Sequence, residues 1–169
     1  MRRPEKLIYW IAAIVFIVRA NNLSAGEFEK KGKALSSLLG TTKVKVKKVP
    51  RGKQQVEVYF TKEGNALGGK IAVIEEGLYP PNCTHTWAIG IDTKSGKVNA
   101  IRVLEMQCPH AFPCQKASYL EQYIGKGPAD VATLDKDIQT IAKATATANL
   151  TTDAVKRAIQ TVNQIKGTL

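Results

Sequence analysis

The chain has 169 residues, 44% of them hydrophobic, and a formal net charge of +11. That length supports one compact domain with its own core and excludes two large domains. The positive charge favours acidic partners or anionic lipid, but the lysines are scattered and few aromatic residues lie between them, so nucleic acid is not an expected partner.

The first 25 residues have the pattern of an export signal. A basic start is followed by a twelve-residue apolar run at 7–18, which Arg19 ends. A membrane-spanning helix needs about 20 apolar residues, whereas the apolar part of a signal peptide has about 7–15. Cleavage after Ala20 or after Ala25 fits the small residues there, and an uncleaved anchor is the alternative. We therefore expect an exported domain at 26–169, in the periplasm or an equivalent compartment, whose basic surface allows peripheral membrane association.

The first predicted elements of this domain are a helix and a hairpin. Apolar residues on one helical stripe predict a helix over 27–39 that ends at Gly40. Alternating Lys and Val predict a strand over 43–49 with one exposed face. The turn residues 50–52 and a second alternating segment, 56–60, complete the hairpin.

The middle of the chain predicts further strands. These segments are short and alternate apolar with other residues: 70–74, 87–91 and 98–106. The segments between them are rich in glycine or turn residues, or carry two adjacent prolines that exclude regular structure: 64–69, 78–83 and 92–96.

Two helices are expected near the end of the chain. One is short and amphipathic, over 119–124, and is closed by Gly125. The other has its apolar stripe over 155–165, with Thr151 or Thr152 as its cap. The predicted fold class is α+β, a single domain with an antiparallel sheet of hairpins and with an N-terminal helix and C-terminal helices packed on it.

Over roughly the last 100 residues, which fit within one domain, the order of elements resembles the FMN-binding domain family. That family includes the flavinylated subunits of sodium-pumping NADH:quinone reductase and Rnf-type redox complexes. The resemblance is carried by a central hairpin at 86–107, a loop with prolines at 108–114, a short helix at 118–125 and a motif at 139–147. In the family, the phosphate of FMN is joined to a threonine within the motif Asp-x-x-Ser/Thr-Gly-Ala-Thr.

The matching stretch here is Gln139-Thr140-Ile141-Ala142-Lys143-Ala144-Thr145. The resemblance implies that Thr145 carries the flavin, next to Ala144 and Lys143, and Thr147 matches a hydroxyl residue that often follows. Gln139, Ala142 and Lys143 depart from the family pattern, and Lys143 replaces the glycine that would allow a positive φ. A loop and helix cap of small polar residues is the alternative interpretation of this segment.

The resemblance also implies that the loop at 108–114 lies near the flavin ring, so His110 and Phe112 are candidate contacts. Ordinary core packing is the alternative for Phe112. The expected function is electron transfer through FMN, as a subunit of an exported redox complex. A cofactor-free descendant of the domain, which serves as an assembly or interaction subunit, is the alternative. We find no convincing general base or nucleophile, so a stand-alone enzyme is not expected.

Three cysteines and two histidines flank the central hairpin. In an oxidising compartment we expect a disulfide, either between Cys108 and Cys114 or between Cys83 and one of them. Metal ligation by these residues is a second interpretation, although their spacing matches no standard zinc pattern and we predict no metal site. Cysteines without a role are the third. A thiol-based or metal-binding protein is accordingly a further functional hypothesis.

Overall fold

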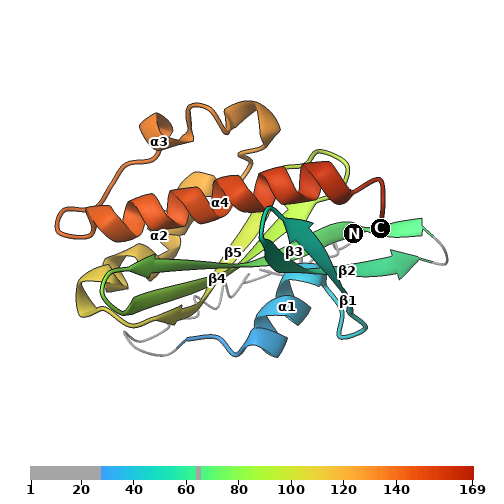
Figure 1. Cartoon of the computed structure of the whole chain (residues 1–169), viewed down its shortest axis with the longest axis horizontal. Coiled ribbons are helices and arrows are strands. Elements are labelled where there is room, and N and C mark those ends of the chain that lie inside the picture. The colour runs from blue at the N-terminus through green and yellow to red at the C-terminus, as the bar shows by residue number, and fades with distance from the viewer. Residues whose placement is uncertain (1–27, 64–65) are drawn as a thin grey trace, which may run out of the picture.

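The computed structural model describes residues 28–63 and 66–169. The predicted export signal, residues 1–25, lies outside the described residues. One antiparallel sheet forms the centre of the molecule, and two helices, α1 (Lys31–Leu39) and α4 (Thr145–Ile165), cover its opposite faces (Figure 1). This arrangement confirms the predicted α+β class, with an antiparallel sheet between an N-terminal helix and C-terminal helices.

The sheet has five strands whose spatial order follows their order in the sequence. They are β1 (Lys45–Arg51), β2 (Gln54–Glu63), β3 (Ala66–Tyr79), β4 (Cys83–Asp92) and β5 (Val98–Met106). β1 and β5 are therefore the two edges. The predicted hairpin over 43–60 and the pair of strands around the turn at 92–96 are both present.

β3 is much longer than the predicted strand at 70–74. It begins at Ala66, so the glycine-rich segment predicted as a loop belongs largely to the strand. Gly68 tolerates this place because its missing side chain leaves room for Thr61, whose Oγ1 would lie 1.9 Å from an added Cβ. The prediction of irregular structure over 78–83 was also wrong at its ends, since Tyr79 pairs with Cys83 and the turn consists of the two prolines and Asn82.

α1 packs on one face of the sheet. It ends at Gly40, where φ is 73°, as the sequence predicted. Leu35 and Leu38 bury its apolar stripe against Tyr59 and Ala88. The charged residues of this helix remain on the solvent side.

α4 packs on the other face and closes the main core. Its residues Val155, Ile159 and Val162 are buried, as is Trp87 at the centre of the sheet. The prediction that Thr151 or Thr152 caps this helix was wrong, because α4 begins at Thr145 and both threonines are buried within it. Threonine is a weak helix former, so these first turns are hard to predict from the local pattern, and packing against the sheet stabilises them.

Short helices connect β5 to α4. They are η1 (Pro109–Gln115), α2 (Ala117–Leu120), η2 (Glu121–Tyr123), η3 (Pro128–Asp130) and α3 (Leu134–Asp137). The predicted helix at 119–124 corresponds to α2 and η2, and Gly125 follows with φ at 81°. None of the helices within 28–63 and 66–169 is long and apolar enough to cross a membrane.

Candidate functional site

The loop after β5 and the start of α4 meet at one end of the sheet. The Sγ of Cys114 in η1 lies 3.9 Å from the carbonyl oxygen of Ala144. The β3–β4 turn lies at this end too, because His85 of β4 contacts Thr147 in the first turns of α4. The structure thus brings together the loop at 108–114 and the motif at 139–147, which are separate in the sequence.

Thr145 is the first residue of α4, and it is exposed. Two residues earlier, Lys143 has a φ of 66°, in the left-handed region where glycine is free of strain. No side chain among the described residues caps the helix at Ala144. The first N–H groups of an α-helix have no partner within the helix, so here they can receive an anion. An FMN phosphate on the Thr145 hydroxyl would therefore fit beside donors and the Lys143 cation.

Two other residues of the predicted site are buried. Ala144 is 3% exposed and Thr147 is 6% exposed, so neither offers a surface to a ligand. Instead, the Oγ1 of Thr147 lies 3.4 Å from the Nε2 of His85. Thr147 thus has a contact inside the protein.

Phe112 and His110 are the other two predicted flavin contacts. Phe112 is partly buried, its ring packs edge-on against that of Phe28 at 6.3 Å between centroids, and it lines an open groove of about 1070 Å³ along β5. Thr145 and Lys143 do not line this groove. His110 is exposed on η1 and does not line it either. The packing of Phe112 on Phe28 agrees with the core-packing alternative, and its contact with a flavin stays a prediction.

No protein-family model, curated protein or solved structure matches this chain. The candidate site is accordingly defined by its own geometry.

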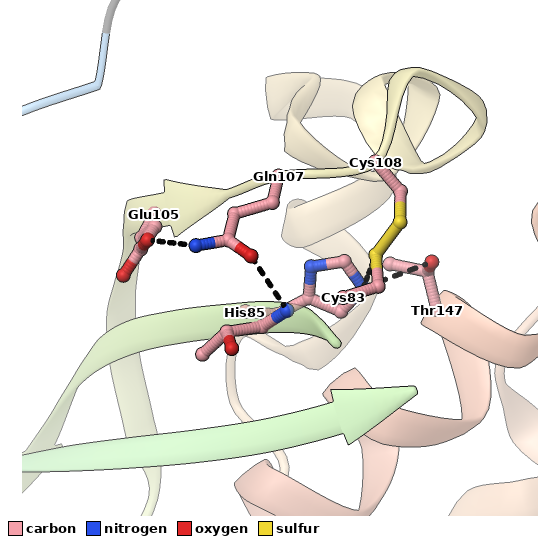
Figure 2. Close-up of a disulfide and its surroundings, with 7 residues drawn as sticks. Cys83, His85, Glu105, Gln107, Cys108 and Thr147 are labelled. Carbon is pink, nitrogen blue, oxygen red and sulfur yellow. Dashed lines mark hydrogen bonds between the residues drawn. A yellow bond between two sulfur atoms is a disulfide. The ribbon is translucent and has the colours of Figure 1, made fainter. Parts of the chain in front are cut away.

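The disulfide joins Cys83 and Cys108, so the predicted pairing of Cys108 with Cys114 was wrong and the alternative with Cys83 is the observed one (Figure 2). The cause is strand register. β4 and β5 are antiparallel with His85 opposite Met106, and continuing that register places Cys108 opposite Cys83, with their Cα atoms 5.9 Å apart. Cys114 is a buried free thiol, and burial raises its pKa to about 11.

His85 lies directly under this disulfide. Its side chain is fully buried, and its Nε2 is 3.8 Å from the Sγ of Cys83 (Figure 2). Burial lowers the pKa of His85, so the imidazole is neutral at pH 7. No hydrogen-bond partner for its Nδ1 is found among the described residues. A buried polar atom without a partner is uncommon and calls for a reason.

Within the described residues, no group of three or more His, Cys, Asp or Glu side chains is arranged to hold a metal ion. Two of the thiols proposed as ligands are joined in the disulfide. The metal-binding interpretation of the cysteine cluster therefore finds no geometry here to support it.

Sequence reasoning missed a buried ion-pair cluster on the α4 face of the sheet. Glu75 of β3 is 1% exposed, and its carboxylate accepts hydrogen bonds from Arg51 of β1 and Arg157 of α4. The Arg157 Nε lies 2.9 Å from the Glu75 Oε2. Alternation gave a signal, because Ile71 and Val73 are buried and Glu75 continues the same face.

A second missed cluster joins the short helices to α4. The hydroxyl groups of Tyr119 and Tyr123 are 2.7 Å apart, and that of Tyr123 is 2.9 Å from the Oγ1 of Thr152. Burial raises the pKa of both tyrosines, which keeps them protonated. This chain of hydroxyl groups gives Thr152 a structural role in place of the predicted cap.

Proposed function

We propose that the chain is an extracytoplasmic electron carrier with FMN joined to Thr145, and that it works as a subunit of an exported redox complex. The observation that carries the proposal is the backbone around Lys143. Its left-handed conformation is the one that the glycine of the resembling motif would supply, and it leads directly into an exposed threonine at a helix start. The positive φ of Lys143, at the position that matches the motif's glycine, supports the proposal although the sequence there departs from the motif.

The residues around Thr145 have distinct parts in this proposal. The Thr145 hydroxyl would hold the phosphate, while the first N–H groups of α4 and the exposed Lys143 would offset its negative charge. Bound FMN would supply the acceptance and release of electrons. Because the site lies at the surface, the protein needs no substrate pocket of its own.

The test is the intact mass and visible absorption of protein purified from its native host. We expect one FMN per chain, retained after denaturation and mapped to the peptide that contains Thr145. Thr145→Val should abolish the added mass. Thr140→Val, an exposed threonine shortly before α4, is the matched control and should keep it.

A colourless protein of unmodified mass from the native host would overturn this proposal. In the resembling family a transferase attaches the FMN, so material made in a host that lacks such an enzyme is not a test.

A second candidate, a cofactor-free interaction subunit, is favoured by the exposed basic edge strand β1. Lys45, Lys47 and Lys48 are exposed there, and Val46 between them is 57% exposed. Lysines on an edge strand discourage pairing between sheets but attract an acidic surface. This edge therefore suits a subunit of the complex that is acidic.

Co-purification from the native host tests this candidate. Partner subunits should remain bound to a colourless chain, and Lys45→Glu together with Lys48→Glu should release them. Lys94→Glu together with Lys97→Glu, in the exposed turn between β4 and β5, is the control with the same change of charge. A chain that runs as a free monomer at low salt would exclude this function.

A further inference from the structure

We propose that Cys83–Cys108 is a redox-active disulfide that exchanges with dithiol partners through Cys108, and that His85 stabilises the Cys83 thiolate released in the exchange. The proposal is independent of whether Thr145 carries a flavin. It rests on the different exposure of the two sulfur-bearing residues and on the imidazole that faces one of them.

Exposure decides which sulfur is attacked. Cys83 is 6% exposed and lies in the core, whereas Cys108 is only partly buried, at the point where β5 gives way to η1. Figure 2 shows Cys108 on the side of the bond away from His85, and Cys83 on the side of His85 and Thr147. An incoming thiolate therefore reaches Cys108, and Cys83 becomes the leaving group.

The imidazole of His85 faces the leaving group. Its Nε2 is 3.8 Å from the Cys83 Sγ and 3.4 Å from the Thr147 Oγ1, and the backbone of Thr84 offers the ring a further acceptor. A neutral imidazole can carry its hydrogen on either nitrogen, and a thiolate at Cys83 favours the tautomer with the hydrogen on Nε2, because Nε2 then donates to the thiolate. A disulfide sulfur is a weak acceptor, but a thiolate is a strong one. The reduced state therefore gains a hydrogen bond that the oxidised state lacks.

The exchange would pass through a mixed disulfide at Cys108. A thiolate of the partner bonds to the Cys108 Sγ, the Cys83–Cys108 bond breaks, and its electron pair remains on the Cys83 Sγ. The Cys83 thiolate accepts the Nε2–H hydrogen bond and stays ionised. The partner's second thiol loses its proton, attacks the partner's own sulfur in the mixed disulfide and releases Cys108, which takes up that proton. The partner dithiol is oxidised to a disulfide, and this protein is reduced to a Cys83 thiolate and a Cys108 thiol.

The supporting hydrogen bonds keep this end of the sheet in place while the bond is open. The backbone N–H of Thr84 in β4 donates to the Gln107 Oε1. The Gln107 Nε2 in turn donates to Glu105, two residues earlier in β5. The N–H of Gln107 also donates to the Thr84 carbonyl oxygen. β4 and β5 are therefore joined next to the two cysteines by contacts that do not need the disulfide.

A redox titration tests the part of His85. The protein is equilibrated with mixtures of reduced and oxidised dithiothreitol, trapped with N-ethylmaleimide and weighed by mass spectrometry. His85→Phe should shift the equilibrium at least tenfold toward the disulfide, which is about 30 mV for a two-electron couple. Trp87→Phe is the matched control, since it alters the ring that packs on His85 at 5.8 Å and should stay within twofold of the unaltered protein. An equilibrium within twofold for His85→Phe overturns the proposal.

A measurement on the unaltered protein keeps the proposal testable if His85→Phe does not fold. Reduced glutathione should form its mixed disulfide on Cys108, identified in peptides after acid quenching. An adduct on Cys83, or no exchange at all while the protein is folded, would show that the bond has only a structural role.

Discussion

A single buried imidazole links the stability of this protein to pH. In the unfolded chain His85 is expected to have an ordinary pKa of about 6.5, and burial lowers the pKa in the folded state. As the pH falls below about 6.5, the unfolded chain binds a proton at this residue before the folded protein does, so the free energy of unfolding falls. The contribution of His85 is thus present above that pH and is lost below it.

We therefore predict that the free energy of unfolding declines between about pH 6.5 and pH 5, where carboxylates remain largely ionised. His85→Phe should flatten the decline in this window, measured by urea unfolding at each pH. His110→Phe, at the exposed histidine of η1, is the matched control. An equal slope in the unaltered protein and in His85→Phe would contradict this explanation.

The elements of the fold differ in how far the sequence predicts them. α1 and the strands around Ile89 show clear periodicity, which predicted both strands and the end of α1, although the helix begins later than predicted, at Lys31. The predicted strand at 70–74 is shorter than β3 because the glycines before it are typical of a loop. In the structure Gly68 lies within the strand, where its lack of a side chain leaves room for the side chain of Thr61. The start of α4 was missed because threonine and alanine alternate there without an apolar stripe. The bounds of β3 and α4 both depend on packing against other elements. The local sequence pattern carries no information about that packing.

The disulfide shows the same limit within the candidate site. Counting back from the turn, with Ile91 opposite Val98, would place Met106 opposite Cys83. Two irregularities in the register, at Thr86/Trp87 and Gly90/Ile91, shift the pairing so that Cys108 lies there instead. Spacing alone could not reveal these bulges. By contrast, the resemblance singled out Thr145 from its local sequence, and the structure shows that residue exposed at the start of α4.

The junction before α4 allows a test at the scale of one element. Lys143 has a φ of 66°, which a residue with a side chain adopts at a cost of about 1–2 kcal/mol, while glycine adopts it freely. Lys143→Gly should therefore raise the free energy of unfolding by about 0.5–1 kcal/mol after the larger entropy of the unfolded glycine is counted.

Lys116 provides the matched control for this change. It is also an exposed lysine next to a short helix, but its φ is −62°. Lys116→Gly should lower the free energy of unfolding by about 0.5–1 kcal/mol, because glycine gains nothing there and loses more entropy on folding. Chemical unfolding of both variants gives the comparison, and shifts of the same sign would show that strain at Lys143 is not the cause.

At the scale of the whole molecule, the Glu75 cluster joins the edge strand β1, the central strand β3 and the covering helix α4. Arg51 comes from β1, Glu75 from β3 and Arg157 from α4, so the cluster spans more than half of the sequence. The carboxylate side chain has no exposure, whereas both arginine side chains retain some, at 25% and 34%. The buried negative charge is therefore the member that most needs its partners.

Removing both arginines should cost far more than removing all three charged groups. Arg51→Met with Arg157→Met leaves the Glu75 carboxylate buried and unpaired, and we expect a loss of about 3–5 kcal/mol in the free energy of unfolding. Adding Glu75→Met should recover most of that loss, because apolar side chains of similar volume then fill the site. Arg102→Met, at a half-exposed ion pair with Glu29, is the control and should cost under about 1 kcal/mol. Urea unfolding measures the free energy of unfolding of each variant. If the triple variant is no more stable than the double variant, compensation of a buried charge is not the cause. The cluster would then contribute through its packing and its hydrogen bonds between the three elements.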